Sequence, residues 1–198
     1  MSHVYDVLSS EVVYSGGVMS LRRDDVAMPG DTHSVRDVVV HPGAVAVVAL
    51  DEDNQMVLVR QYRHPVGRQL DELPAGLLDK AGEPAHETAA RELAEEAGLA
   101  AAEWHVLVDV LTTPGMSDEA IRIYLARDLR EVERDVQQHE EAEMTSFRRP
   151  LELVVAAVMT GEYENGLLVA GALAADRAVR TGLAGLRSVD APWPARAP

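Results

Sequence analysis

The pattern of hydrophobic and polar positions predicts a chain that begins with short strands. Residues 12–14 and 18–23 alternate weakly, and the valine-rich residues 35–41 follow the turn-like sequence Pro29-Gly30-Asp31. These strands are too few to form a stable unit alone. We therefore expect them to pack on the rest of the chain or on a second subunit.

A boundary at Pro42-Gly43 separates this region from the centre of the chain. Residues 44–50 are all apolar and predict a buried strand, residues 51–54 form a polar turn, and residues 56–62 return from it, which predicts a β-hairpin. Residues 63–83 are rich in Gly, Pro and charge, and we expect them to be irregular.

A helix is predicted from about Pro84 to Ala97, because Pro84 suits the first helical turn and Gly98 suits the residue just past the end. A later helix is expected to begin at Asn165, a good N-cap. The remaining predicted elements are strands at 104–111 and 120–125, an acidic loop at 128–145, a helix at 150–160, and the end of the last helix before Gly182.

Composition narrows the possible partners. Hydrophobic residues make up 47%, enough for a packed core, and the formal net charge of -15 disfavours binding to nucleic acid polymers or to an anionic membrane surface. The absence of cysteine excludes disulfides, thiolate metal sites and cysteine nucleophiles. The seven histidines show no zinc-like spacing. No targeting segment or apolar run of membrane-spanning length is found, so we expect a cytoplasmic protein.

Three glutamates share one side of the predicted helix. Glu92, Glu95 and Glu96 stand at positions i, i+3 and i+4, a spacing that gathers side chains on one face. Like charges this close cost a few tenths of a kcal/mol per pair, roughly 0.2–0.5. A divalent cation such as Mg²⁺ would offset that cost, because it prefers carboxylate oxygen and also holds substrate phosphates. A solvated acidic face is the alternative in so acidic a chain.

The residues around these glutamates form a longer motif. Glu83, seven spacers, Arg91-Glu92-Leu93, one spacer, Glu95-Glu96, one spacer and Gly98-Leu99 resemble the second part of the Nudix box. The family pattern has a glycine six positions before its first glutamate, whereas Gly76 lies seven before Glu83. We interpret this as one extra residue in the loop, which leaves the glutamate helix unchanged.

This resemblance implies an α/β fold: a Nudix α/β/α sandwich around a mixed β-sheet, with a small N-terminal antiparallel β appendage. Residues 1–42 would form the appendage and serve in dimerisation, residues 43–185 the hydrolase domain, and residues 186–198 a flexible tail. A homodimer is expected, because unpaired strand edges need partners. Whether the appendage strands are swapped between subunits is left open.

The resemblance also implies roles for the box residues. Glu92 and Glu96 would be the principal ligands of Mg²⁺, for which Mn²⁺ could substitute. Glu95 would be a further ligand or a water-mediated one, Glu95 and Glu96 would act in catalysis, and the backbone carbonyl of Ala75 would complete the metal site. The structural residues of the motif would be Gly76, Glu83, Arg91 and Gly98, with Arg91 paired to Glu83 and Gly98 ending the helix in a left-handed turn.

Flanking residues resemble those of the ADP-ribose pyrophosphatase subfamily. Pro114 lies fifteen residues past Leu99, near the position of a characteristic proline. Arg63, in Gln61-Tyr62-Arg63, would hold the substrate diphosphate through its planar multi-donor fork. Arg36 and Asp37 resemble a substrate-binding pair on the N-terminal strand. An exposed strand residue without a role in binding is an equally good interpretation of Arg36. Nearby alternatives are Arg60 and Arg68.

The acidic residues 138–143 resemble a loop that carries a catalytic glutamate in this subfamily. Glu141 aligns best and would orient or deprotonate the attacking water. Its nearest rivals are Glu140 and Glu143. Without the family resemblance, a solvated run of charge would explain these residues equally well.

The sequence therefore predicts Mg²⁺-dependent hydrolysis of the diphosphate of a nucleoside-diphosphate sugar, foremost of ADP-ribose to AMP and ribose 5-phosphate. One alternative is a Nudix enzyme for GDP-mannose, NADH or a diadenosine polyphosphate. Another is a non-catalytic nucleotide-sugar sensor, against which the retention of all three helix glutamates argues. A third is an acidic structural protein, which no repeat or heptad pattern supports.

Overall fold

The structure is a computed structural model that describes residues 4–134 and 144–196. The chain forms two compact units, which are described separately. The first consists of Met1–Gly43 together with Leu111–Ala120, and the second of Ala44–Val110 and Ile121–Pro198. The assignment of residues 111–120 to the first unit is not evident in the sequence.

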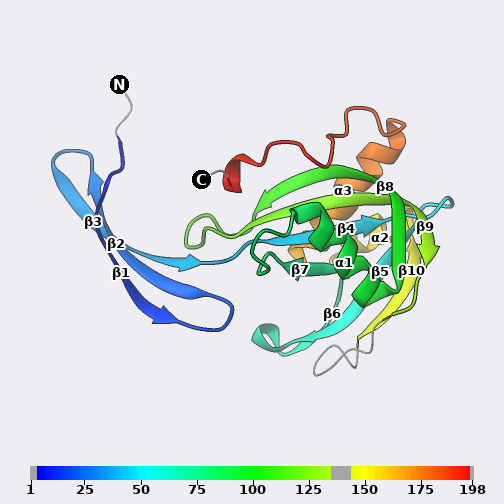
Figure 1. Cartoon of the computed structure of the whole chain (residues 1–198), viewed down its shortest axis with the longest axis horizontal. Coiled ribbons are helices and arrows are strands. Elements are labelled where there is room, and N and C mark those ends of the chain that lie inside the picture. The colour runs from blue at the N-terminus through cyan, green and yellow to red at the C-terminus, as the bar shows by residue number, and fades with distance from the viewer. Residues whose placement is uncertain (1–3, 135–143, 197–198) are drawn as a thin grey trace. The chain divides into compact units, whose positions relative to one another are not determined.

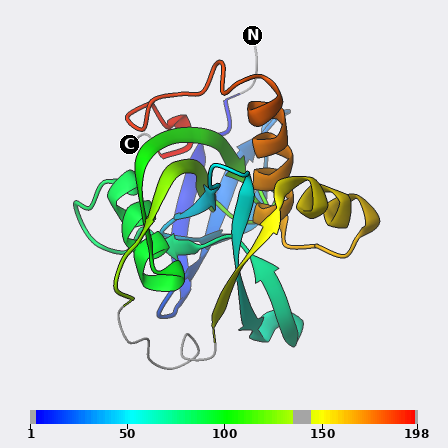
Figure 2. The ribbon, with the colours of Figure 1, turned by 90° about the vertical axis from the view of Figure 1, so that its right-hand side faces the viewer.

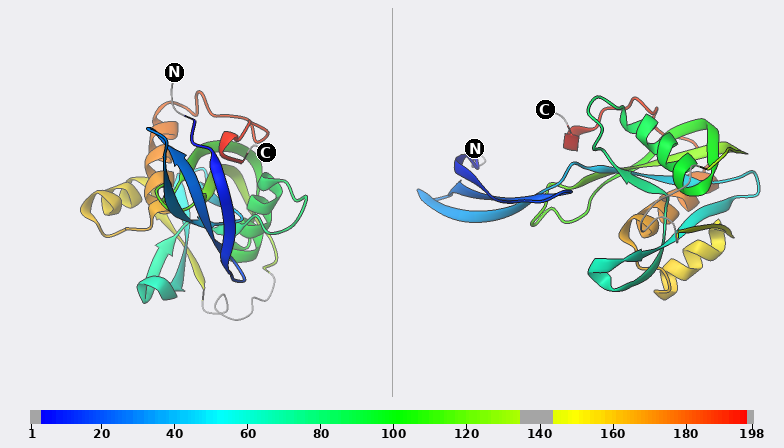
Figure 3. Two further views of the ribbon diagram at one scale, coloured as in Figure 1. Left: turned by 90° about the vertical axis from the view of Figure 1, so that its left-hand side faces the viewer. Right: turned by 60° about the horizontal axis from the view of Figure 1, so that its bottom comes forward.

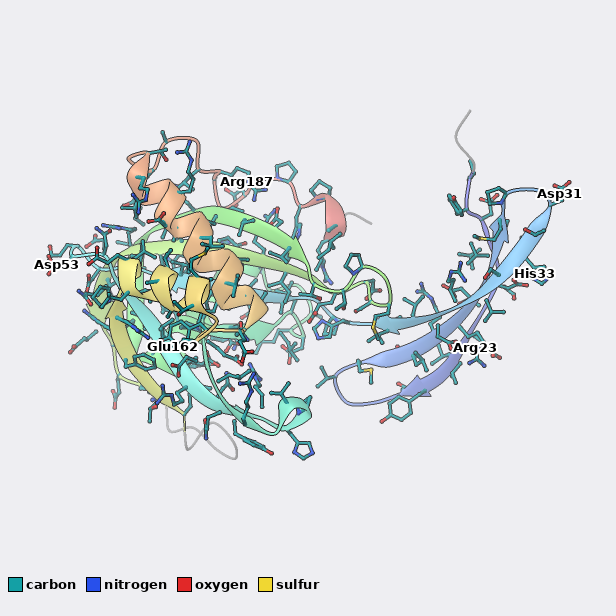
Figure 4. The ribbon with its side chains drawn as sticks, turned by 180° about the vertical axis from the view of Figure 1, so that it is seen from behind. Arg23, Asp31, His33, Asp53, Glu162 and Arg187 are labelled. Carbon is teal, nitrogen blue, oxygen red and sulfur yellow. The ribbon has the colours of Figure 1, made fainter. Side chains whose placement is uncertain are left out.

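The first unit is built on a three-stranded antiparallel sheet in the order β1-β2-β3 (Figure 3). Its strands are β1 (Val7–Ser15), β2 (Ser20–Met28) and β3 (Thr32–Val40). They are longer than the weak alternation of the sequence indicates. The turn between β2 and β3 contains Gly30 and Asp31, both with positive φ, and Asp31 lies at its tip (Figure 4).

Residues 111–120 are joined to the end of β3 by backbone hydrogen bonds. The amide of Val39 donates to the carbonyl of Met116 at 2.8 Å, and the amide of Asp118 donates to the carbonyl of Val39 at 3.2 Å. The Asp118 carboxylate also accepts from the amide of His41 at 2.9 Å. The loop that contains Pro114 is thus held by these bonds within its own unit.

The second unit contains two sheets, with strand orders β7-β4-β9-β8 and β10-β5-β6. The first sheet is mixed, because β4 pairs parallel with β9 and antiparallel with β7. The strands are β4 (Ala44–Ala49), β5 (Gln55–Arg63), β6 (Arg68–Glu72), β7 (Ala75–Leu77), β8 (Leu99–Leu111), β9 (Ala120–Glu131) and β10 (Thr145–Pro150). The helices are α1 (Ala85–Ala97), α2 (Leu151–Thr160) and α3 (Gly166–Arg180), with short 3-10 turns at His64–Val66 and Pro194–Arg196.

Helices cover both faces of the strands, with α1 on one side and α2 and α3 on the other (Figures 1 and 2). Strand β4 is buried along its whole length. Alternate side chains of β4 enter different core clusters: Ala46 and Val48 belong to the cluster that contains residues of α2 and α3, and Val47 to the cluster that contains Ala89 and Leu93 of α1. This arrangement is the expected α/β/α sandwich around a mixed sheet.

The predicted hairpin of residues 44–62 is wrong. Strands β4 and β5 belong to different sheets, and the bridge between them is the isolated pair Leu50 and Met56. Two partners already flank each strand, β7 and β9 for β4, and β10 and β6 for β5. Strands β4 and β5 therefore pair with other strands and not with each other.

Two further segments are more regular than predicted. Residues 63–83 contain the short strands β6 and β7, which their Gly, Pro and charged residues conceal. Strand β9 continues to Glu131 and β10 begins at Thr145, so both ends of the segment predicted as an acidic loop are extended. The helices predicted at 84–97 and from Asn165 are confirmed.

Gly171 of α3 is a point of close packing. A Cβ atom there would lie 2.8 Å from Cδ1 of Leu73 and 2.9 Å from Cγ2 of Val48. We expect Gly171→Val to lower the free energy of unfolding by about 2 kcal/mol, because an added branched side chain overpacks the interface. Urea unfolding followed by circular dichroism measures this. Gly166→Ala is the matched control, since Gly166 has no atom within 4 Å of its Cβ position. Equal stability of the two variants would contradict the packing account.

Candidate active site

Helix α1 presents its glutamates from a firmly bounded segment. It follows Pro84 and ends at Gly98, whose φ of 67° is left-handed and whose amide donates to the Ala94 carbonyl at 3.0 Å. Ala89 and Leu93 are buried against the sheet. This burial fixes the rotation of the helix about its axis and therefore the direction in which its glutamates point.

Two of the glutamates lie against the backbone of β7. Glu96 is only 5% exposed, and its Oε2 accepts a hydrogen bond from the Ala75 amide at 3.0 Å. The Glu92 carboxyl group lies so close to Gly76 that a Cβ atom at position 76 would be 2.1 Å from its Cδ and Oε1. Glycine is therefore required at position 76 for Glu92 to take this place.

Arg91 binds three carboxylates around this site. Its guanidinium donates to Glu83 at 3.2 and 3.3 Å, to Glu92 at 2.6 Å and to Glu95 at 2.9 Å. These contacts raise the pKa of Arg91, and the hydrogen bond with Glu83 has the largest effect. Hydrogen bonds from Arg91 and then from Thr88 lower the pKa of Glu83. Glu83 is therefore a carboxylate at neutral pH, and the Arg91–Glu83 pair ties the loop before α1 to the helix.

The carboxylate oxygens of these residues are the donor type that a divalent cation prefers. Within residues 4–134 and 144–196, no three His, Asp or Glu side chains are already grouped as metal ligands. Instead a guanidinium nitrogen of Arg91 contacts the Glu92 and Glu95 carboxylates. Partly buried carboxylates that attract a cation are the hard oxygen donors that Mg²⁺ prefers. Glu92, Glu95 and Glu96 could hold such an ion beside the Ala75–Gly76 backbone.

A buried carboxylate that the sequence analysis missed holds Arg63. Glu72 is 3% exposed, and it accepts from Nε of Arg63 at 3.0 Å and from Nη2 at 2.6 Å. Gln61 also donates to Glu72 at 3.3 Å. In the sequence, Glu72 stands directly before Leu-Pro-Ala-Gly, which could have drawn attention to it. Its contact with Arg63 becomes evident only from the β5–β6 register. Glu72 lies three residues before Ala75 in the sequence, so a short segment joins the carboxylate that anchors Arg63 to β7.

The two alternatives to Arg63 are engaged elsewhere. Arg60 forms a two-point ion pair with Asp71, at 2.6 and 2.8 Å, and its guanidinium lies over the ring of Phe147. Arg60 and Arg63 point to opposite faces of β5, because side chains alternate along a strand. Arg68 pairs with Glu164 in the connection between α2 and α3.

The predicted substrate residues of the first unit occupy different faces of its sheet. Asp37 accepts from Arg23 at 2.8 and 3.2 Å, whereas Arg36 donates to Ser34 at 2.5 Å and to the Val35 carbonyl at 3.1 Å. Neighbours in a strand point to opposite sides, so Arg36 and Asp37 do not share a face. Pro114 lies in the turn in which the amide of Met116 donates to the carbonyl of Thr113. The predicted loop residues Glu140, Glu141 and Glu143 lie outside the described residues.

The comparison with family models agrees with this geometry. A model described as the NUDIX domain matches residues 40–165, which contain both the glutamate helix and Arg63. The chain belongs to the Nudix family. It is a hydrolase of this family, and the matched range includes the helix glutamates, the Ala75–Gly76 segment and the Arg91–Glu83 pair.

Named Nudix relatives are similar over different lengths. The chain is 52% identical to an ADP-ribose pyrophosphatase of Mycobacterium tuberculosis over 191 residues, which cover 96% of this chain and 92% of the relative. It is 40% identical to an ADP-ribose pyrophosphatase of Bacillus subtilis over 122 residues, 62% of this chain and 65% of the relative. A solved structure of an ADP compounds hydrolase shares the fold, with a TM-score of 0.78, 21% identity, and coverage of 91% of this chain and 96% of that one.

Among the helices of the described residues, none combines the length and apolar character that crossing a membrane would require.

The contact between Gly76 and Glu92 can be tested through cation binding. We expect Gly76→Ala to weaken Mn²⁺ binding at least about tenfold, because its Cβ displaces the Glu92 carboxylate from the site. Isothermal titration calorimetry of the purified variant measures the affinity. Gly17→Ala is the control, since no atom lies within 4 Å of the Cβ position at Gly17. Wild-type affinity in Gly76→Ala would show that Glu92 is not a ligand in this position.

Proposed function

We propose that this Nudix hydrolase splits the diphosphate of ADP-ribose to AMP and ribose 5-phosphate in a Mg²⁺-dependent reaction. The observation that carries the proposal is the placement of Glu92 and Glu96 against the Ala75–Gly76 backbone. Arg63, anchored by Glu72, adds a positioned guanidinium. The substrate is supported by the two relatives that are named ADP-ribose pyrophosphatases. With a net charge of -15, the protein is expected to act on a small molecule in the cytoplasm and not on a nucleic acid polymer.

The metal site would be formed by Glu92 and Glu96 as principal ligands, Glu95 as a further ligand, and the carbonyl of Ala75. Bound Mg²⁺, or Mn²⁺ in its place, would neutralise phosphate charge and lower the pKa of a coordinated water. When the cation binds, it would replace Arg91 as the partner of Glu92 and Glu95. Arg91 would stay paired with Glu83, and this pair would keep the loop before α1 in place.

Each remaining residue has a role in binding or proton transfer. Arg63 would bind the diphosphate, because a guanidinium offers several donors in one plane and remains charged. Glu72 would orient Arg63 by holding its Nε and Nη2 edge. Glu141 would take the proton from the water that attacks one phosphorus in line. Arg36, Asp37 and Pro114 would contact other parts of the substrate. Since Arg36 and Asp37 point to opposite faces of β3, they would do so from different sides of the strand.

We also propose that the protein is a homodimer built on the first unit. Apolar side chains are exposed on both faces of its sheet, among them Val12 at 67% and Val13 at 46%. Strand β1 is exposed along its whole length. A three-stranded sheet with so much exposed apolar surface requires a partner, and a second copy offers a matching surface.

The catalytic role of Glu96 is tested by Glu96→Gln. The amide side chain can still accept from the Ala75 amide, so we expect the fold to persist while kcat for ADP-ribose falls about 10³-fold, which corresponds to about 4 kcal/mol. Turnover is measured as AMP release at saturating Mg²⁺. Glu87→Gln is the matched control, because Glu87 is an exposed glutamate in the first turn of the same helix.

Wild-type turnover by Glu96→Gln would refute this assignment. Binding of ADP-ribose by the unmodified protein without any turnover would favour the nucleotide-sugar sensor. A panel with GDP-mannose, NADH and diadenosine polyphosphate completes the test, and a higher kcat/KM for any of them would overturn the choice of ADP-ribose.

The dimer is tested by Val12→Asp. We expect the unmodified protein to have twice the 21.5 kDa mass of one chain, and the variant to have the mass of one chain, because a buried unpaired carboxylate is costly. Light scattering after size-exclusion chromatography measures both masses. Met159→Asp, at an exposed position at the end of α2, is the control. A wild-type mass equal to one chain would refute the dimer.

A further inference from the structure

Arg122 of β9 is a buried cation whose donors are directed to partners far away in the sequence. It is 3% exposed, and it donates to the two carboxylate oxygens of Asp109 in β8 at 2.7 and 3.0 Å. It also donates to the backbone carbonyls of Ala191 at 2.8 Å and Pro192 at 3.0 Å. A single guanidinium thus connects two neighbouring strands to a segment near the C-terminus.

The same segment makes further contacts with β8. Arg187 follows α3 (Figure 4) and donates to Asp109 at 2.7 Å. Its backbone carbonyl accepts from the amide of Val106 at 2.9 Å. We call residues 187–193 the C-terminal strap. The sequence analysis predicted a flexible tail over residues 186–198. The contacts of the strap were not predicted, because its partners lie about 70 residues away in the sequence.

Trp193 ends the strap by stacking on Arg122. The guanidinium carbon lies 4.7 Å from the centroid of the indole ring. The indole Nε1 is buried without a hydrogen-bond partner among residues 4–134 and 144–196. Its N–H therefore does not hold Trp193 in place there, whereas the face of its ring contacts Arg122.

The side-chain contacts of the strap with Asp109 and Arg122 fall near the ends of the two strands that carry loop 111–120. Asp109 stands two residues before the last residue of β8, and Arg122 two residues after the first residue of β9. The chain between them includes Pro114. Any loosening of these two strand ends is passed by covalent connection to both ends of the loop.

We propose that the C-terminal strap clamps the ends of β8 and β9, and that Arg122 is thereby a positioning residue for the loop that contains Pro114. The link to substrate rests on the proposed function, in which Pro114 contacts ADP-ribose. The clamp itself does not rest on it, because it consists of contacts within the second unit. Without the stacked indole, the strap carbonyls are held less firmly, and the pair of Arg122 and Asp109 becomes accessible to water.

Trp193→Ala tests the clamp by hydrogen exchange of the full-length protein without substrate. We expect the amides of Met116, Ser117 and Asp118 to exchange about tenfold faster than in the wild type. The amides of β4 should stay within about twofold, because the core of the second unit is unchanged. Trp193→Phe keeps a ring over Arg122 and loses the unpartnered N–H, so it should restore wild-type exchange. Unchanged exchange of the loop in Trp193→Ala would overturn the clamp.

Kinetics with ADP-ribose separates positioning from general destabilisation. We expect Trp193→Ala to raise KM about fivefold with kcat within about twofold, because a loosened loop loses binding that is equal in the ground and transition states. Faster exchange with an unchanged KM would overturn the link to substrate and leave the clamp intact. Faster exchange in a protein that does not turn over ADP-ribose would refute the proposed function and not the clamp.

A second pair of variants covers the case in which Trp193→Ala does not fold. Arg187→Ala removes one strap contact to Asp109, and Arg180→Ala removes a comparable ion pair with Asp176 on α3, outside the strap. Faster exchange of the loop amides in Arg187→Ala, but not in Arg180→Ala, supports the clamp. Equal behaviour of the two variants overturns it.

Discussion

The close approach of the Glu92 carboxylate to the backbone at Gly76 is the contact on which the rest of the site depends. It is possible only because position 76 has no side chain, since a Cβ would stand 2.1 Å from the carboxyl carbon. The neighbouring Ala75 amide holds Glu96 at 3.0 Å, so one short strand places two carboxylates of α1. Burial of Ala89 and Leu93 fixes the helix in the orientation that makes both contacts. A cation bound there would rest on elements that the core already holds in place.

In so acidic a protein, guanidinium groups held in place by carboxylates would be the means of binding the proposed anionic substrate. The net charge is -15, yet the site contains Arg91 beside the helix glutamates and Arg63 beside Glu72. Arg91 is anchored on Glu83 in addition to its contacts with Glu92 and Glu95, and Arg63 is anchored on Glu72. Anchoring reduces the side-chain entropy that would be lost on binding a diphosphate. The overall charge, in turn, disfavours polymeric nucleic acids.

Features specified by local chemistry could be predicted from the sequence. Pro84 and Gly98 bound α1, Asn165 caps α3 with its side chain, and the box spacing gave the family and the fold. Features specified by pairing across the chain could not be predicted. Strands β4 and β5 were predicted as a hairpin because they are adjacent in sequence, but each has two other partners.

The missed residues of the site have the same cause. Glu72 is recognisable as the partner of Arg63 only once β5 and β6 are in register, and Arg122 only once the strap lies across β8 and β9. Arg36 and Asp37 show the limit of adjacency in sequence, because neighbours in a strand face opposite ways. The motif therefore predicted which types of residue form the site, whereas the strand pairing determines which of these residues are in contact.

The central claim is that divalent ions bind to the glutamates of α1 beside Ala75 and Gly76. Anomalous diffraction from crystals soaked with Mn²⁺ and ADP-ribose tests it most directly. The account predicts a manganese peak within roughly 2.2 Å of carboxylate oxygens of both Glu92 and Glu96, a distance typical of small divalent ions on oxygen ligands. Manganese bound only at other acidic positions, such as Asp51 or Asp128, with none at Glu92 and Glu96, would contradict it.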